Sequence, residues 1–168
     1  MLVIKDSMVV IHLAKLLLLE NSCDYFKCVI IPERVYNEIL KGKKKGFPDV
    51  PIVLNLIKEK KIGVKKVKNK ELVAKAYQFN IQRGEAEVLA LYWQENADLI
   101  ATDDDNVRKK RIILNIEVIG TPAIILQLYK EKIISKEKIH RSISELRHIG
   151  WFSNAVLDKI LLEAMNYD

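Results

Sequence analysis

The segment Leu99-Ile100-Ala101-Thr102-Asp103-Asp104-Asp105 passes from a short, mainly apolar run to three consecutive acids. Such a run predicts a buried β-strand over 99–102, with Asp103 directly after it. The N-terminus has the same form, because the run 2–5 ends at Asp6. Both segments therefore place a carboxylate at the carboxyl end of a strand.

Apolar runs of this kind alternate with helical patterns along the chain. Ser7 is the expected N-cap of the first helix, and Gly42 is the expected end of the second. Short strands that alternate with helices are typical of an α/β fold, here a three-layer α/β/α arrangement around a central parallel sheet of four or five short strands. Besides 2–5 and 99–102, we expect strands over 28–31, 62–67 (the least regular) and 117–119, and helices over 8–19, 33–40, 51–61, 72–79, 85–95, 106–114 and 121–130.

The C-terminal part of the chain continues as helices. Apolar residues recur at helical spacing over 139–146 and again over 156–164, with a break near Gly150-Trp151. We therefore expect an α/β domain over 1–134 and a C-terminal helical extension over 135–168 that packs on the same domain.

Length, composition and charge limit the classes of function. The chain has 168 residues, 49% apolar and 30% charged, which suits one domain with its own core. No apolar run reaches the roughly 18 to 20 residues of a membrane span, and the acidic start differs from a signal peptide, so we expect a cytoplasmic protein. Its 28 basic and 22 acidic residues give a net charge of +6, which favours an anionic partner such as nucleic acid.

The acids at the strand ends are the first candidates for chemistry. Ligands of open parallel sheets gather beyond the carboxyl ends of the strands, so Asp6 and Asp103 share one cleft if their strands are neighbours. Glu38, in the helix after the second strand, and Glu85, at the start of the helix before 99–102, can join them. Converging carboxylates repel one another unless a cation compensates, and oxygen ligands without His or Cys favour Mg²⁺ or Mn²⁺. Such a site suits hydrolysis of phosphodiester bonds.

Each acid also has a purely structural interpretation. Asp6 and Ser7 can cap a helix, Glu85 can complement a helix dipole, and Glu38 can be a solvated surface charge. Asp104 and Asp105 can pair with Arg108 and Lys109 at helical spacing. Glu87 lies two positions after Glu85 and is expected to face away from it, at the surface.

Five segments of the chain form a wider pattern: Val3-Ile4-Lys5-Asp6-Ser7, residues 31–38 from Ile-Pro-Glu to Glu38, Gly84-Glu85-Ala86-Glu87, residues 99–104 and Ile119-Gly120-Thr121. Taken together, these segments resemble the PIN-domain family of nucleases, which includes the VapC toxins. The resemblance implies metal-dependent cleavage of RNA, with Asp6, Glu38, Glu85 and Asp103 as metal ligands or near-ligands and Asp104 as an outer-shell or second-metal contact. It also implies a homodimer and, for a toxin, a small antitoxin protein whose tail fills the acidic cleft.

Other polar and aromatic residues are weaker candidates. Ser7 and Thr102 flank two acids, and Arg108 and Lys109 follow Asp103 closely enough to meet a phosphate of bound RNA. The histidines His12, His140 and His148 lack metal-ligand spacing and are expected in structural or surface roles, and Trp93, Trp151 and Phe152 are expected in the core or an interface.

Two further classes of function stay open at this point. One is an RNA-processing nuclease or a non-catalytic RNA-binding module that keeps the fold, although all four acids of the family pattern are present. The other is a receiver-type phosphotransfer domain, which requires an acidic pair after the first strand, whereas the acidic pair here follows a late strand.

Overall fold

A parallel sheet of five strands forms the centre of the protein, in a computed structural model that describes residues 1–167. The order across the sheet is β3-β2-β1-β4-β5, and every neighbouring pair is parallel. This confirms the predicted α/β fold. The irregular segment near 62–67 does contain a strand, so the sheet has five strands and not four. The strands are β1 (Leu2–Lys5), β2 (Cys28–Pro32), β3 (Ile62–Lys65), β4 (Leu99–Ala101) and β5 (Val118–Ile119).

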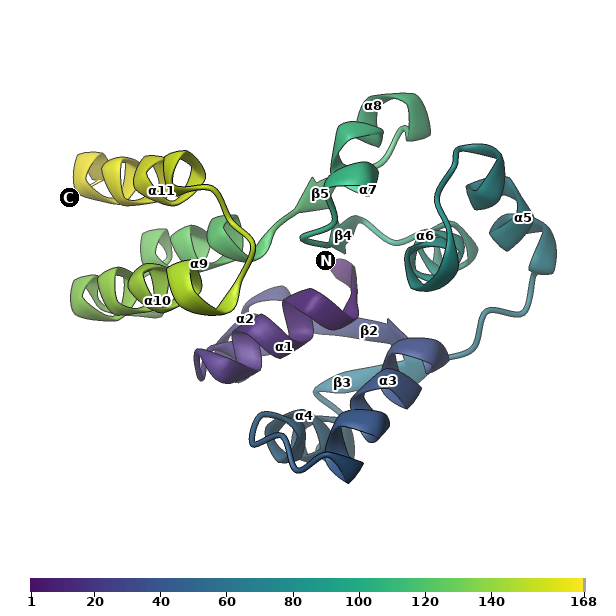
Figure 1. The fold of residues 1–168 in the computed structure, drawn as a ribbon, viewed down its shortest axis with the longest axis horizontal. Coiled ribbons are helices and arrows are strands. Elements are labelled where there is room, and N and C mark those ends of the chain that lie inside the picture. The colour runs from purple at the N-terminus through teal and green to yellow at the C-terminus, as the bar shows by residue number, and fades with distance from the viewer. Residues whose placement is uncertain (168) are drawn as a thin grey trace.

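Helices cover both faces of this sheet. The chain adds β2 and β3 on one side of β1 and then crosses back to add β4 and β5 on the other side. Because crossovers between parallel strands are right-handed, the helices that connect these two sets of strands lie on opposite faces of the sheet. Figure 1 shows α1 and α2 on one side of the sheet and α5 and α6 on the other. The helices are α1 (Ser7–Lys15), α2 (Leu19–Phe26), α3 (Glu33–Lys44), α4 (Val50–Lys58), α5 (Lys70–Gln78), α6 (Arg83–Glu95), α7 (Asp105–Lys109), α8 (Arg111–Leu114), α9 (Thr121–Lys130), α10 (Lys136–Ile149) and α11 (Asn154–Tyr167).

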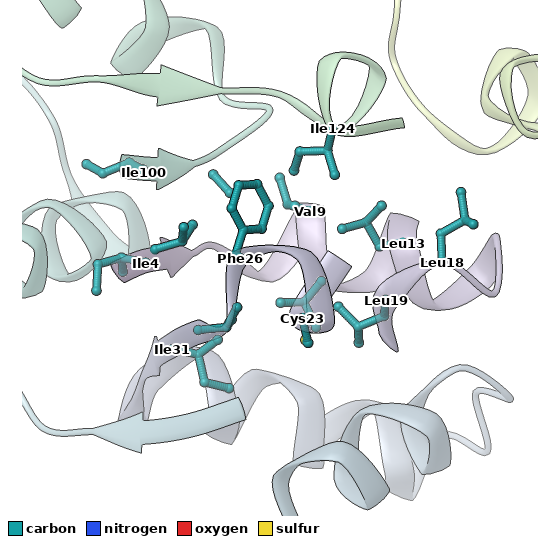
Figure 2. Close-up of a cluster of buried hydrophobic side chains, with 14 of the residues drawn as sticks. Ile4, Val9, Leu13, Leu18, Leu19, Cys23, Phe26, Ile31, Ile100 and Ile124 are labelled. Atoms are coloured by element: carbon teal, nitrogen blue, oxygen red, sulfur yellow. The ribbon is translucent and has the colours of Figure 1, made fainter. Parts of the chain in front are cut away.

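The main core lies between the sheet and the α1/α2 layer. Ile4 of β1 and Ile100 of β4 pack with Leu13 of α1 and Phe26 of α2, as Figure 2 shows. Ile124 extends this core to α9, which lies against α1 and α2. Buried on both faces, β1 is fixed between two strands and two helical layers, and so is the residue that follows it.

The first helical segment is shorter than predicted. Instead of one helix over 8–19, α1 ends at Lys15 and α2 begins at Leu19, with Leu17 in a left-handed conformation (φ 57°). A continuous helix would spread four successive leucines around its axis. The break lets Leu16 and Leu18 face the core and leaves only Leu17 exposed.

Two predicted helix ends are also wrong. The N-cap of α1 is Asp6 and not Ser7, because the Asp6 side chain accepts a hydrogen bond from the Val9 amide. Helix α3 continues through Gly42 to Lys44. A Cβ atom at Gly42 would lie 3.1 Å from Val50, so the glycine allows α3 to approach α4 closely and does not end the helix.

The predicted helix over 106–114 is divided into two. Asp104 caps α7, which ends at Lys109, and α8 begins at Arg111. The Lys110 ammonium between them donates to the carbonyl oxygen of Phe79 at 2.6 Å. This bond ties the junction to the end of α5.

The C-terminal helices form part of the same packed body. Helices α10 and α11 pack on α9 and on each other, and Ile143 and Leu157 are fully buried in the common core. The division into a domain over 1–134 and an extension over 135–168 stays a prediction. In the part of the chain that the structure describes, no helix is long and apolar enough to cross a membrane.

A buried charge lies in the core beside the sheet. The Lys5 side chain is fully buried, donates to the Ser22 hydroxyl and lies over the Phe26 ring at 5.4 Å from its centroid. Burial lowers the pKa of Lys5 from 10.5 to about 8, and interaction with Cys23 opposes this only in part. The charged form is therefore destabilising at neutral pH.

We expect the pH dependence of stability to report this lysine. Between pH 8 and 10.5 the unfolded chain holds a proton on Lys5 that the folded chain has released, so stability rises with pH over this range, by an amount on the order of 3 kcal/mol. The variant Lys5→Met should remove this rise and be the more stable protein at pH 7. Urea titrations at pH 7 and pH 10 measure both effects, with exposed Lys66→Met as the matched control. An unchanged rise in Lys5→Met would contradict the assignment.

Candidate functional site

The two strand-end acids follow neighbouring strands at the point where the strand order reverses. β1 pairs with β4, Lys5 lies opposite Ala101, and the Asp6 amide donates to the Ala101 carbonyl at 3.0 Å. β2 and β3 lie on one side of β1, and β4 and β5 lie on the other side, so the strand order reverses between β1 and β4. Such a switch point is where parallel α/β sheets bind their ligands.

A cleft of about 730 Å³ opens at this point, and the structure places all four candidate acids in its wall. Asp6 and Asp103 come from the strand ends, Glu38 comes from α3 and Glu85 from the first turn of α6. Among the described residues, the lining holds six carboxylates and three arginines, in a protein whose net charge is +6. The cleft is therefore acidic although the protein as a whole is basic. The charged lining residues are Asp6, Glu38, Glu85, Asp103, Asp104, Asp105, Arg34, Arg83 and Arg108.

Asp103 is held in place by α9 and α1. The Thr121 amide donates to Asp103 Oδ1 at 2.7 Å, and the Thr121 hydroxyl donates to Oδ2 at 2.6 Å. His12 Nδ1 lies 2.9 Å from the same Oδ2 atom. Gly120 allows this approach, because a Cβ atom there would lie 3.1 Å from Asp103 Oδ1. The carboxylate orientation is thus fixed before any ligand binds.

Asp6 is buried and carries a perturbed pKa. Burial raises its pKa from 3.8 to about 7, and the nearby charge of Asp103 acts in the same direction. Hydrogen bonds from the Thr102 hydroxyl and from the Val9 amide oppose the shift without cancelling it. Among residues 1–167, no interaction therefore offsets the burial of an ionised Asp6.

Glu38 and Glu85 form the more exposed wall. Arg34 Nε lies 3.4 Å from Glu38 Oε1, and a Cβ atom at Gly84 would lie at the same distance from that oxygen, so α6 begins directly against α3. Arg34 also lies 3.8 Å from Glu87. Glu87, predicted to face away at the surface, is instead half-buried and paired with an arginine of the cleft.

The acids after Asp103 have local partners. Asp104 Oδ1 accepts from the Val107 amide at 2.8 Å, so Asp104 caps α7 and does not pair with Arg108. Asp105 lies 3.7 Å from Lys109, as the helical spacing predicted. Thr102 is buried beneath the site, where its hydroxyl accepts from the Asp104 amide at 3.0 Å.

Two of the four candidate RNA-binding residues line the cleft, and two do not. Ser7 and Arg108 line the cleft, whereas Lys109 is exposed and outside the lining. Thr102 contacts the Asp6 carboxyl but is not exposed to a ligand.

Residues that the sequence analysis set aside complete the cleft. His12 was expected in a structural or surface role, yet it contacts Asp103, while His140 and His148 are exposed as expected. Trp151 and Phe152 also line the cleft, and Trp151, which is 99% exposed, does not belong to the core, whereas its expected alternative position in an interface stays a prediction. Arg34 and Arg83 were not predicted, although Arg34 lies four positions before Glu38, a spacing at which helical side chains meet. Trp93 is partly buried against the core, as expected.

A comparison with family models gives a match to the PIN domain over residues 2–166. The chain belongs to the PIN-domain family. PIN domains are generally nucleases that act on nucleic acid with divalent metal ions, and the resemblance drawn from the strand-end acids is confirmed. No curated protein and no solved structure matches the chain.

The lining of this PIN domain fits a hard divalent ion in its donor chemistry. Its candidate ligands are carboxylates, which Mg²⁺ and Mn²⁺ prefer, and its buried Asp6 lacks a compensating charge. Within residues 1–167 no three His, Cys, Asp or Glu side chains lie close enough to form a complete cage. Mg²⁺ does not require one, because it keeps several waters and binds through one or two carboxylates and the phosphates of a substrate.

We expect the variant Asp6→Asn to be more stable than the wild type in EDTA at pH 8. The raised pKa means that the folded state holds a proton on Asp6 that the unfolded state has lost, so stability falls as pH rises from about 4 to about 7. Asparagine keeps an acceptor for the Val9 amide without the buried charge, and the gain is on the order of 4 kcal/mol. Thermal unfolding in EDTA and in Mn²⁺ measures this.

Mn²⁺ should raise the melting temperature of the wild type more than that of Asp6→Asn, because an ion that binds the folded state stabilises it. Asp24→Asn, an exposed acid on α2, is the matched control. A variant less stable than the wild type in EDTA would contradict the account of Asp6.

Proposed function

We propose that this PIN domain is a Mg²⁺- or Mn²⁺-dependent endoribonuclease that hydrolyses RNA phosphodiester bonds in the cleft between β1 and β4. The observation that carries the proposal is the meeting of acids from four separate segments at the switch point of the sheet. A basic protein with one acidic cleft is suited to a polyanion whose phosphates are bridged to carboxylates by a cation.

We assign Asp6 and Asp103 as the ligands nearest the ion. Thr121 and His12 hold the Asp103 carboxylate towards the cleft, and the position of Asp6 as N-cap of α1 fixes its own carboxyl. Glu38 and Glu85, on the more exposed wall, would add negative charge around the ion, since the described residues form no closed cage of three or more ligands. Asp104 serves as an outer contact while it caps α7.

The chain's own residues place the substrate for in-line attack. Arg108 and Ser7 line the cleft beside Asp103 and Asp6, so they bind the phosphate next to the scissile one. The chemistry that the bound ion supplies is activation of water and neutralisation of the charge that develops on the phosphate oxygens. The buried floor, with Thr102 below Asp6, keeps bulk water away from the carboxylates.

The variant Asp103→Asn tests the site. It removes one ligand charge with little change of shape, so we expect at least a hundredfold loss of RNA cleavage with an unchanged circular-dichroism spectrum. The assay uses single-stranded and hairpin RNAs with Mn²⁺, Mg²⁺ or EDTA, and Asp24→Asn serves as the matched control. Cleavage by Asp103→Asn at the wild-type rate would overturn the site assignment, and cleavage in EDTA would overturn the metal requirement.

We also propose that the nuclease is the toxin of a toxin–antitoxin pair, in which a small antitoxin inserts a basic tail into the cleft. The support is charge complementarity, because the lining has more carboxylates than arginines among the described residues. The toxin form is a homodimer. Light scattering should give twice the chain mass of 19.4 kDa, and an arginine-rich synthetic peptide should inhibit cleavage. A monomer insensitive to such a peptide would favour an RNA-processing role.

A further inference from the structure

An exposed tryptophan stands at the mouth of the acidic cleft. Trp151 is 99% exposed, the largest exposed fraction among the large apolar side chains that the structure describes. It lines the same cleft as Asp6 and Asp103, with the partly exposed Met8 and Val156 nearby in the lining. An exposed indole that lines a polar cleft together with other exposed apolar side chains is suited to stacking against a flat ligand.

The segment that presents Trp151 is anchored on both sides. The Phe152 ring packs on His12, with 5.5 Å between the ring centroids, and His12 contacts Asp103. A Cβ atom at Gly150 would lie 2.3 Å from the Phe152 ring, so only glycine lets that ring lie against the backbone. The segment between α10 and α11 is thereby fixed to the wall of the site.

A second contact braces the helices on either side. Arg147 of α10 donates to the Asn154 side chain at 2.7 Å and also pairs with Asp158 of α11. Together with the packing of Phe152, this brace fixes the backbone that carries Trp151 at the wall of the site. Less of the chain then has to be ordered when a flat ligand stacks on the indole.

The cations that line the same cleft as the indole indicate the class of ligand. The chain has 22 lysines and six arginines, and three of those arginines, Arg34, Arg83 and Arg108, line this cleft. Guanidinium groups suit phosphate oxygens, and an aromatic platform beside phosphate-binding groups is the usual arrangement for single-stranded nucleic acid. The bases of a duplex are already stacked on one another and leave no free face for the indole.

We propose that Trp151 is a stacking platform for an unpaired base close to the scissile phosphate, and so a residue of this chain that positions the substrate. This inference rests on the proposed nuclease function. The platform positions the substrate, and the acids carry out the chemistry. A hairpin would then be cut in its loop and not in its stem.

Binding measurements with a matched pair of ligands test the platform. The first ligand is a labelled single-stranded 12-nucleotide RNA, and the second is a strand of equal length with abasic sites, which keeps the phosphates and lacks the bases. Fluorescence anisotropy is recorded with Ca²⁺ in place of Mn²⁺, and a gel confirms that the strands stay intact. The proteins are the wild type, Trp151→Ala, Trp151→Phe and Tyr77→Ala, which removes an exposed aromatic ring on α5 outside the cleft.

We expect Trp151→Ala to bind the RNA about tenfold more weakly, Trp151→Phe to retain most of the affinity, and Tyr77→Ala to match the wild type. The abasic strand should bind the wild type and Trp151→Ala equally. In a Trp93→Phe background, which leaves Trp151 as the only tryptophan, the RNA should quench the fluorescence and the abasic strand should not.

Each other outcome overturns a different claim. Equal RNA binding by the wild type and Trp151→Ala would overturn the platform and leave the nuclease proposal in place. An equal loss of affinity for both ligands would show that Trp151 acts through the fold and not by stacking. A change of oligomeric state with unchanged RNA binding would assign the indole to a protein interface. Failure of every protein to bind RNA would overturn both proposals.

Discussion

The site depends on the burial of one carboxylate, that of Asp6, between two neighbouring parallel strands. The pairing of β1 with β4 fixes Asp6 beside Asp103, and the helical layers on both faces keep water from it. Both effects favour the protonated acid, so the pKa of Asp6 rises to about 7. A fold selected for stability alone would place an apolar or amide side chain there. The retained charge makes physical sense if a cation completes the site.

The rest of the architecture serves to hold acids that repel one another. Thr121 at the start of α9 and His12 on α1 fix Asp103, and the close approach of α3 and α6 at Gly84 brings Glu38 to the opposite wall. These contacts come from segments far apart in the sequence. The packing of the two helical layers on one sheet therefore pre-organises the ligands, and the free energy of folding offsets their mutual repulsion.

Much of this arrangement follows from local sequence patterns, and some of it cannot. Asp6 and Asp103 are predictable because each ends an apolar run, and parallel strands bring their carboxyl ends to one edge. Glu38 and Glu85 could be named as candidates from their positions in helices next to the strand ends, but only the resemblance to a family favoured them over surface charges, since a helical glutamate alone has no signature. The contact of His12 with Asp103 joins residues 91 positions apart, and Trp151 lines the same cleft as Asp6 from the far end of the chain. Only the folded chain reveals such pairs. The break at Leu17 was not predictable for a similar reason, because it depends on the burial of its neighbours in the folded protein.

The central claim is that the cleft is built around a divalent cation whose charge the buried Asp6 requires. Calorimetric titration of the wild-type protein with Mn²⁺ at pH 8 and at pH 5.5, in buffers of different ionisation enthalpy, tests it most directly. The account predicts binding at pH 8, weaker binding at pH 5.5 where Asp6 is protonated, and release of a proton when the ion binds at the lower pH. No Mn²⁺ binding at either pH, or binding with the same affinity and no proton release at both, would contradict it.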